Sequence, residues 1–424
     1  MRLERKLSLP CGIDFGTSNS SVGFFRDGAP ELARVEGEAA TIPSAIFIPA
    51  HGGAAEFGRQ AIESYVEGEN GRLFRALKSI LGGELIDEAT PAGGKRVPFK
   101  AILGKFLRHL KSKAEAETGV EATNVVLGRP VHFVDDDAAA DAHAEAQLAQ
   151  IARAQGFSDV LFQYEPIAAA LDYEQRIERE EIALIADIGG GTSDFSLVKV
   201  SPATHLKADR KDDILANSGV HVGGTNLDYR LSMKRVMPSF GYRTRQRARP
   251  ELDLPGNFFF ELAQWHRIVF LYNQKVLAEL KHLRAIAEEP HKVERFVRAV
   301  HERYGHRVAG DVEGAKIEMS GTETAIVDLS YIEAELRIET TRRQFEGAIQ
   351  NECEKITKSV EQCLAMAGIA PEQVDTVFFT GGSTSIPAIA RACLAPVPHA
   401  RVVRGDRFAS VGVGLAIDAG LKFR

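Results

Sequence analysis

The sequence predicts an α/β protein built from two similar lobes, and two observations lead to that prediction. Short strands rich in β-branched and aromatic residues alternate with glycine turns and longer helices along most of the chain. In addition, the pattern IDFGTSNSSVGFF, which begins at Ile13, occurs again from Ala186 as ADIGGGTSDFSLV. Each copy is a strand that ends in Asp, a glycine turn with hydroxyl residues, and a returning strand. This duplication predicts two lobes that face each other across a cleft.

The chain is 424 residues long, 44% hydrophobic and 26% charged, which excludes a disordered chain, a collagen and a coiled coil. Its net charge of −6 offers no general attraction to nucleic acid or to an anionic membrane. No apolar run approaches the length of a membrane span, and the N-terminus lacks the apolar core of a signal peptide. The four cysteines show no C-x-x-C spacing and are expected to be buried thiols. We therefore expect a cytoplasmic protein without nucleic-acid or membrane partners.

The individual elements follow from periodicity and turn residues. Strands are expected at residues 11–15, 21–25, 124–131, 160–165, 182–188, 195–200 and 374–380. The acidic run at 135–137 is expected to cap a helix that ends near residue 155, because Asp side chains accept from the free N–H groups of a first turn. Further helices are expected at 167–178 and 408–420. The region 225–370 should be mostly helical, with its clearest amphipathic stretches at 257–288 and 331–368.

The two glycine turns have the composition of a phosphate site. Glycine lets backbone N–H groups approach an anion without a Cβ in the way, and the hydroxyls of Thr17, Ser18 and Thr192 add donors. Asp14 and Asp187 end their strands, where they are suited to a hydrated Mg²⁺. One GGGT turn alone could be an ordinary hairpin turn, but two copies with matching aspartates favour the polyphosphate interpretation.

Other phosphate and metal motifs are absent from the sequence. There is no G-x-x-x-x-G-K-[ST] loop and no G-x-G-x-x-G fingerprint. The pair His301 and His306 is separated by five positions, whereas H-E-x-x-H zinc motifs need four. We interpret this pair as part of a solvated helix.

Taken together, the motifs resemble the nucleotide-binding domain of the seventy-kilodalton heat-shock chaperones, the DnaK-type family. The resemblance is collinear and covers nearly the whole chain. It rests on residues 12–24, 128–133, 164–173, 185–198, 221–228, 313–320 and 377–389. It implies the actin-like ATPase fold, with ribonuclease H-like duplicated lobes and a nucleotide in the cleft between them.

The resemblance also implies roles for individual residues. Asp14, Asp187 and Glu165 would be the metal site, with Glu165 acting through water. The phosphates would be held by Gly16, Thr17, Ser18, Gly189, Gly190 and Gly191. Lys78 matches the family's catalytic lysine, which positions the attacking water, although taken alone it could be an exposed helix lysine. Thr192 would contact the γ-phosphate and Asp194 would order the water. The remaining nucleotide contacts would come from Gly223, Gly224, Glu313, Lys316, Ser320, Gly381, Gly382, Ser383 and Ser385.

Two departures from the family pattern concern the adenine base. Ser385 stands where the family has an adenine-stacking arginine, and Ile317 replaces a second basic residue. Each lost stacking or cation–π contact would weaken binding by about 0.5–2 kcal/mol. We expect either a weaker nucleotide affinity or a base that is held differently.

A further departure concerns length. The family's hydrophobic linker and peptide-binding β-sandwich are missing from this sequence, so the chain looks closest to the short YegD-like branch of the family. Classical peptide holding is therefore not expected. Lobe I should comprise residues 1–183 completed by 405–424, and lobe II residues 184–404 with a helical subdomain at about 225–370.

The function expected from this resemblance is slow hydrolysis of ATP to ADP with Mg²⁺, with K⁺ as a candidate second ion. Hydrolysis would be coupled to lobe closure as a switch, in a chaperone-like protein whose client and cochaperone are unknown. Two alternatives stay open. The protein could be a pseudo-ATPase that senses nucleotide or serves as a scaffold, or a filament-forming ATPase of the MreB type, which residues 406–414 resemble distantly.

One basic segment lies outside these motifs. TRQRAR at 244–249, preceded by Arg243, could form a basic strand face for a partner or an anionic surface, or a solvated tether. The sequence favours the solvated interpretation.

Overall fold

The computed structural model describes residues 9–423 apart from 135–136, 175–176, 205–206, 208 and 406–409. The chain forms two compact units. The first comprises Met1–Val220, Ser359–Thr384 and Cys393–Arg424, and the second comprises His221–Lys358 and Ser385–Ala392. The boundary between the two predicted lobes, at residues 183 and 184, lies inside the first unit. The predicted lobes therefore differ from these two units, and they stay a prediction.

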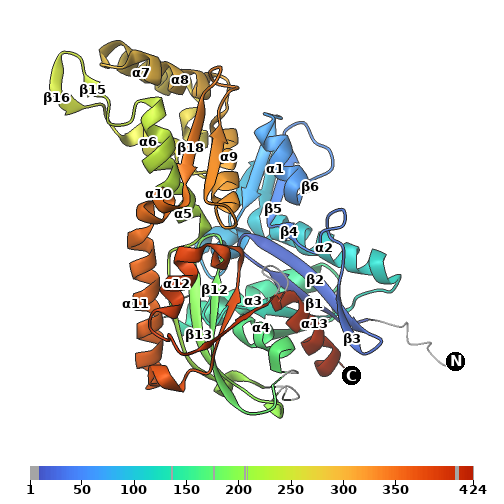
Figure 1. Cartoon of the computed structure of the whole chain (residues 1–424). Helices are drawn as coiled ribbons and strands as arrows, with labels where there is room; N and C mark the ends of the chain where they lie inside the picture. Colours follow the sequence, from blue (N-terminus) through green and yellow to red (C-terminus); the bar gives the residue numbers. More distant parts are fainter. Residues whose placement is uncertain are drawn as a thin grey trace. The chain divides into compact units, whose positions relative to one another are not determined.

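Two sheets of the first unit have the same topology (Figure 1). In one, the order is β11-β10-β1-β2-β3, with β4 also paired to β2, and in the other it is β14-β13-β12-β19-β20. In each sheet, two strands form an antiparallel hairpin and a third strand pairs in parallel with the hairpin's first strand. A fourth strand then pairs in parallel with the third. The strands are Cys11–Phe15 (β1), Asn19–Arg26 (β2), Ala29–Leu32 (β3), Ile42–Pro43 (β4), Asn124–Arg129 (β10), Asp159–Tyr164 (β11), Glu181–Ile188 (β12), Ser193–Val200 (β13), Ile214–Val220 (β14), Thr376–Thr380 (β19) and Arg401–Arg404 (β20).

The duplicated sequence pattern therefore corresponds to a duplicated sheet. The hairpin β1–β2 contains the first copy of the pattern and β12–β13 the second. Register places Asp14 opposite Ser21, and Asp187 opposite Asp194. The strands predicted at these places are confirmed to within about two residues at each end.

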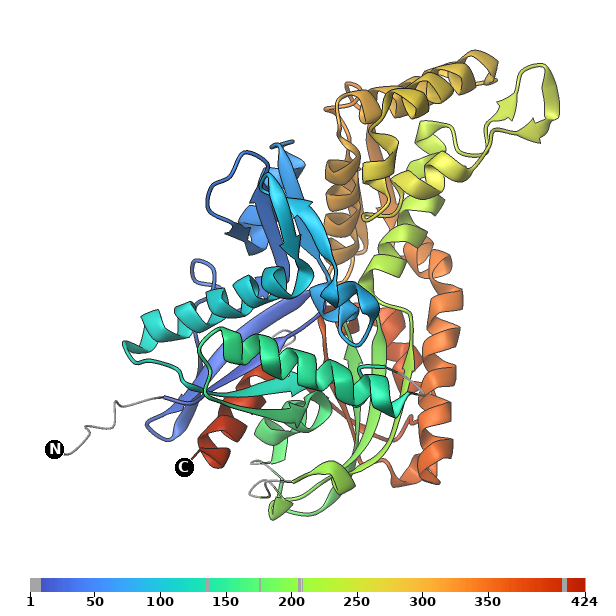
Figure 2. The same ribbon diagram turned by 180° about the vertical axis from the view of Figure 1, so that it is seen from behind.

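Helices of the first unit cover these sheets (Figure 2). Asp137 accepts hydrogen bonds from the backbone N–H groups of Ala139 and Ala140, at 3.1 and 2.9 Å, so α3 begins where an acidic cap was predicted. The rest of that acidic run lies outside the described residues. The helices are Gly58–Val66 (α1), Phe99–Thr118 (α2), Ala138–Ala154 (α3), Glu165–Glu174 (α4) and Ser410–Lys422 (α13), with 3-10 turns at Leu77–Ile80, Glu84–Asp87, Lys211–Asp213, Pro371–Gln373 and Gly382–Ser385.

A small subsheet and a hairpin complete the first unit. The subsheet has the order β6-β5-β7 and the hairpin is β8–β9. Their bounds are Ala45–Pro49 (β5), Glu56–Phe57 (β6), Gly71–Arg75 (β7), Ala89–Ala92 (β8) and Lys95–Pro98 (β9).

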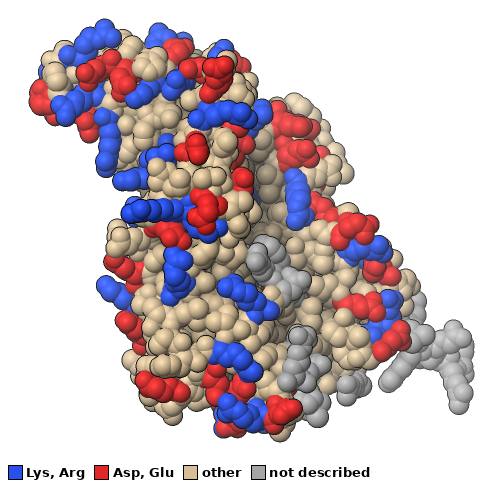
Figure 3. Space-filling view, in the orientation of Figure 1, with Lys and Arg blue, Asp and Glu red and all other residues tan. Residues whose placement is uncertain are grey.

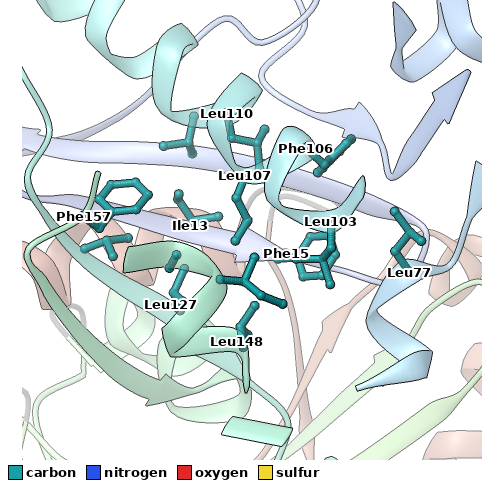
Figure 4. Close-up of a cluster of buried hydrophobic side chains, with 14 of the residues drawn as sticks. Ile13, Phe15, Leu77, Leu103, Phe106, Leu107, Leu110, Leu127, Leu148 and Phe157 are labelled. Carbon is teal, nitrogen blue, oxygen red and sulfur yellow. The ribbon is translucent and has the colours of Figure 1, made fainter. Parts of the chain in front are cut away.

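The core beneath the first hairpin is built from one face of β1 and one face of α2 (Figure 4). Ile13 and Phe15 of β1 pack with Phe106 and Leu107 of α2, and all four side chains are at most 1% exposed. Burying side chains of this size stabilises the fold by about 1.5–3 kcal/mol each. Because alternate residues of a strand face opposite sides, burying Ile13 and Phe15 directs Asp14 to the other face.

The second unit is mostly helical but contains two hairpins. The predicted amphipathic stretch 257–288 divides into α6, a 3-10 turn and α7. The prediction of helix over 331–368 is wrong at its start, because Arg337–Thr341 (β18) pairs with Thr324–Asp328 (β17). The alternating sequence Ile-Glu-Thr-Thr is favourable for a strand that is buried on one side. The other elements are Gly224–Leu231 (α5), a π-helical turn Ser232–Val236, 3-10 turns Met237–Phe240 and Ile268–Leu271, Arg245–Gln246 (β15), Arg249–Asp253 (β16), Asn257–Leu262 (α6), Gln274–Ile286 (α7), Pro290–His301 (α8), Gly305–Glu318 (α9) and Arg342–Ala348 (α10).

Two helices continue past a boundary between the units. They are Gln350–Ala367 (α11) and Pro387–Leu394 (α12).

All four cysteines are free thiols, with Cys11, Cys363 and Cys393 buried as predicted and Cys353 half-buried. Among the residues that the structure describes, no helix combines the length and the hydropathy needed to cross a bilayer.

Close backbone approach fixes α13 in the first unit. A Cβ on Gly414 would lie 1.8 Å from the carbonyl oxygen of Ala168 in α4, and one on Gly12 of β1 would lie 2.3 Å from the carbonyl carbon of Leu415. Both contacts involve backbone atoms, which cannot move aside independently. Glycine at these two positions therefore lets α13 pack against α4 and β1.

We predict that Gly414→Ala lowers the free energy of unfolding by about 3 kcal/mol, because the added methyl group overpacks a backbone contact. Gly310→Ala in α9 is the matched control, since a Cβ there meets nothing within 4 Å. Alanine favours a helix interior over glycine by up to about 1 kcal/mol, so this control should be neutral or stabilising. Denaturant unfolding measures both, and equal effects of the two substitutions would contradict the packing argument.

Candidate functional site

The two glycine turns of the first unit are held by hydrogen bonds from hydroxyl side chains. Ser44 Oγ donates to the carbonyl oxygen of Gly16 at 2.7 Å, and the Ser44 N–H donates to the carbonyl of Ser18 at 2.8 Å. In the second turn, the Gly189 N–H donates to the Thr192 carbonyl at 3.0 Å, and Ser383 Oγ donates to the Gly189 carbonyl at 3.2 Å. Both turns are thus fixed before any ligand binds.

The same turns approach each other closely. A Cβ on Gly190 would lie 2.0 Å from Ser18 Oγ, so a side chain in the second turn would displace the Ser18 hydroxyl of the first. Gly381, which follows β19, has a φ of 81° and its missing Cβ would lie 2.8 Å from Asp187 Oδ1. Most residues avoid this left-handed conformation, and here a side chain would also displace the Asp187 carboxylate.

Lys78 lies among the acidic residues beside these turns. It is 9% exposed, in the 3-10 turn Leu77–Ile80, and its Nζ forms an ion pair with Glu165 Oε1 at the start of α4. The charges of Asp14 and Asp187 also act on the Lys78 ammonium. The interpretation of Lys78 as an exposed helix lysine is therefore wrong. We call Asp14, Lys78, Glu165 and Asp187 the carboxylate–lysine cluster.

The electrostatics of this cluster are those of crowded, desolvated acids. Burial and, to a lesser extent, the negative charge of Glu165 together raise the pKa of Asp14 to about 7, against the opposing effect of Lys78. Burial likewise raises the pKa of Asp187 to about 8, helped by the charges of Glu165, Asp194 and Asp14. For Lys78, burial lowers the pKa, but the attraction of Glu165 and Asp14 outweighs burial and the net shift is upward. The Lys78 ammonium therefore stays charged, and the carboxylates compete for this one positive group.

A small pocket with a cavity volume of about 30 Å³ adjoins this cluster in the first unit. Glu165, Asp187 and Asp194 line it together with Asn217 and Thr380. Thr192 is exposed and donates from its Oγ1 to Asp194 Oδ2 at 3.0 Å. The pocket therefore has a strongly acidic wall.

The donor set of the cluster fits a hydrated divalent cation. Three carboxylates around one ammonium leave an excess of negative charge, and oxygen is the ligand that Mg²⁺ prefers. Within the described part of the chain, no three His, Cys, Asp or Glu side chains converge closely enough to hold an ion by themselves. These residues therefore suit a Mg²⁺ ion that keeps several of its waters, as Mg²⁺ usually does.

The structure brings some of the predicted site residues together and assigns others to the second unit. Asp14, Gly16, Thr17, Ser18, Lys78, Glu165, Asp187 to Asp194, and Gly381 to Ser383 belong to the first unit. Those of the second unit are Gly223, Gly224, Glu313, Lys316, Ser320 and Ser385.

Within the second unit, Lys316 is committed to a local ion pair. It is 6% exposed, and its Nζ contacts Asp228 Oδ1 at 2.9 Å and the Gly224 carbonyl at 3.5 Å, which ties α9 to α5. Ile317, the neighbour that replaces a basic residue of the family pattern, is 60% exposed. Any contact of Lys316 with a ligand would compete with Asp228.

Sequence reasoning missed several residues of the site. Ser44 holds the first turn from 28 positions away, and no local pattern marks it. Asn217 and Thr380 line the pocket from strands β14 and β19. Asp228 could have been found, because it ends the motif HVGGTNLD and is the acidic partner that a buried lysine needs.

In each of two matching sheets, the first strand has an Asp as its second-last residue and leads into a glycine turn. These features define the class to which this protein belongs: it has the actin-like ATPase fold. The model of the family described as Hsp70 protein matches residues 86–243 and 280–420, which is more than half of the chain. The chain belongs to the Hsp70 family. The predicted resemblance is thus confirmed.

Similar curated proteins agree with this assignment. The chaperone protein DnaK from each of two strains of Thermus thermophilus is 27% identical to this chain over 445 aligned residues. Each alignment covers 97% of this chain and 60% of the relative. The chain therefore spans about three fifths of the length of these relatives.

The raised pKa values predict how stability depends on pH. In the unfolded chain Asp14 and Asp187 lose their protons near their ordinary pKa of 3.8, whereas the folded protein holds them up to about 7 and 8. Between these limits the folded state binds more protons, so its free energy of unfolding should fall as pH rises from about 4 to 8.

We predict that Asp187→Asn flattens this pH dependence, because it removes one of the two titrating groups. Without nucleotide and with a chelator, the wild type should lose more stability than the variant between pH 5 and pH 8, by an amount on the order of 2 kcal/mol. Denaturant unfolding at the two pH values measures this difference. Parallel losses in both proteins would contradict the account of the site's electrostatics.

Proposed function

We propose that this chain binds Mg²⁺-ATP beside the two glycine turns and hydrolyses it slowly to ADP, as a conformational switch. The observation that carries the proposal is the Lys78–Glu165 ion pair, which lies beside the aspartates of two duplicated strand–turn–strand units. Membership of the Hsp70 family suggests a chaperone ATPase and supports this assignment. The curated relatives, named chaperone protein DnaK, support the chaperone part of it.

Asp14 and Asp187 would hold the water ligands of Mg²⁺, and Glu165 would reach them through a further water. When bound, the ion would supply positive charge to the β- and γ-phosphates. Both aspartates are protonated in part at neutral pH in the ligand-free protein, since their pKa values are about 7 and 8. Each must therefore release its proton when a cation binds, so cation affinity should rise with pH.

Lys78 would provide fixed positive charge for the transferred phosphoryl group. Its pKa is raised, so its ammonium stays protonated at any physiological pH. Placed by its ion pair with Glu165, it would offset the charge that develops on the γ-phosphoryl oxygens and orient the attacking water. Thr192 and Asp194, which share a hydrogen bond, would contact the γ-phosphate and the water respectively.

The turns themselves would hold the phosphates. The backbone N–H groups of Gly16, Thr17 and Ser18 in the first turn, and of Gly190 and Gly191 in the second, would face the anion, with no Cβ on the glycines to obstruct it. Gly189, whose N–H bonds the Thr192 carbonyl, would line the phosphate site. Gly381 to Ser383 would continue this surface toward the nucleoside. The adenosine contacts proposed for Gly223, Gly224, Glu313, Lys316, Ser320 and Ser385 rest on the family motifs alone. K⁺ is proposed only as a second ion of the phosphate site.

We predict that Lys78→Ala lowers the rate of phosphate release from ATP by a factor on the order of 100 or more, because it removes charge from the transition state. Asp187→Asn should reduce the rate at least as strongly. Calorimetry with ATP should show that Lys78→Ala still binds nucleotide, which separates a catalytic defect from loss of the site.

Lys100→Ala is the matched control. Lys100 also pairs with a carboxylate, that of Asp87 at 2.9 Å, but both side chains are about half-exposed. Its removal should leave turnover unchanged. Wild-type turnover in Lys78→Ala or in Asp187→Asn would refute the proposed reaction. Nucleotide binding by the wild type without any phosphate release would instead identify a pseudo-ATPase that senses nucleotide.

A further inference from the structure

The second unit carries a hairpin that the family model does not match. Residues 244–279 lie between the two matched stretches, 86–243 and 280–420. This interval contains β15 and β16, the helix α6, the 3-10 turn Ile268–Leu271 and the start of α7. Figures 1 and 2 both show β15 and β16 extending away from α6. We call residues 243–253 the arginine hairpin.

The backbone of the arginine hairpin is anchored to the end of α7. The Arg247 N–H donates to the Ile286 carbonyl at 2.7 Å, and the Glu288 N–H donates to the Arg245 carbonyl at 2.8 Å. At the base, Thr244 Oγ1 donates to Glu289 Oε2 at 3.1 Å. The segment is therefore an ordered ribbon, and the solvated tether favoured by the sequence is not what forms.

Four exposed arginines are concentrated in seven residues of this ribbon: Arg243, Arg245, Arg247 and Arg249. Within the part of the chain that the structure describes, none of them forms an ion pair with a carboxylate. Arg243 lies over the ring of Tyr242 at 5.4 Å from its centroid, and Arg245 donates to the Pro250 carbonyl at 2.9 Å. Four like charges within seven residues repel one another, and an acidic partner would relieve that repulsion.

An apolar surface adjoins these charges. The Tyr242 ring, beneath Arg243, packs edge-on against Phe260 with ring centroids 5.8 Å apart. Phe260 is 39% exposed although it belongs to α6. Arginines beside exposed aromatic rings are the composition found at the centres of protein interfaces.

We propose that the arginine hairpin together with Phe260 is a docking surface for an acidic polypeptide segment that also carries an apolar side chain. Guanidinium groups bind carboxylates through two parallel hydrogen bonds, so an acidic chain would supply the missing partners. The exposed face of Phe260 would cover the apolar side chain. This proposal does not depend on nucleotide hydrolysis.

A protein partner suits this surface better than a nucleic acid. Figure 3 shows Lys and Arg interspersed with Asp and Glu on this part of the molecule. A nucleic acid, by contrast, needs a continuous positive surface along its phosphate backbone. Asp253 lies directly opposite Arg245 in the hairpin, and Glu251 is on the same strand. These carboxylates would repel a phosphate backbone along its length, whereas a short acidic segment can align with the arginines alone.

The test uses the full chain and a fluorescein-labelled peptide of alternating Glu-Glu-Phe and Glu-Glu-Leu triplets, with binding followed by fluorescence anisotropy. Arg247→Gln with Arg249→Gln should weaken binding about fivefold, because two exposed ion pairs are lost. Lys355→Gln with Lys358→Gln removes two exposed charges from α11 and should leave affinity unchanged. Phe260→Ala should also weaken binding, whereas Ile326→Ala, at a 49% exposed residue of β17, should not.

Three results would overturn the proposal. They are the absence of peptide binding to the wild type, equal binding to the wild type and to the double arginine variant, and tighter binding of an oligothymidylate than of the peptide. A peptide with Gln in place of Glu should not bind. Raising NaCl from about 50 to about 200 mM should weaken binding of the acidic peptide, because exposed pairs are screened by salt.

Discussion

The candidate site depends on one electrostatic constraint: a single buried ammonium group, that of Lys78, lies among three carboxylates. Burial, reinforced by the negative charge of Glu165, raises the pKa values of the two aspartates to about 7 and 8. A folded protein keeps such crowded acids only where surrounding structure or a ligand compensates the cost. Glycine at positions 190 and 381 preserves this arrangement, because a side chain there would displace the Ser18 hydroxyl or the Asp187 carboxylate.

The duplicated sheet explains how residues so far apart in sequence reach one place. Asp14 and Asp187 occupy equivalent positions on the first strands of two sheets with the same order, and each strand leads into a glycine turn. The equivalence of these two positions could be predicted from the sequence, because the duplication is visible in the spacing of Asp, Gly and hydroxyl residues. Strand positions followed as well, since both copies begin with a buried apolar run.

Other features could not be predicted from the sequence because long-range contacts determine them. The burial of Lys78 and its pairing with Glu165 join residues 87 positions apart, and the turn FRALKSILG looks like ordinary helix. Ser44 holds the first turn through a contact that no local pattern encodes. The start of the helix expected over 331–368 is replaced by a strand because β17 provides a partner, and strand pairing overrides the local helical periodicity. The arginine hairpin is ordered for the same kind of reason, through hydrogen bonds to the end of α7.

The central claim is that the carboxylate–lysine cluster exists to hold a nucleotide-bound divalent cation, and anomalous diffraction tests it most directly. Crystals grown with ADP and Mn²⁺, which replaces Mg²⁺ at oxygen sites, would be measured near the manganese absorption edge. The account predicts an anomalous peak beside Asp14 and Asp187, with water between the ion and at least one carboxylate, and no such peak in crystals of Asp187→Asn. A manganese peak elsewhere in the molecule, or bound ADP with no ion near these aspartates, would contradict it.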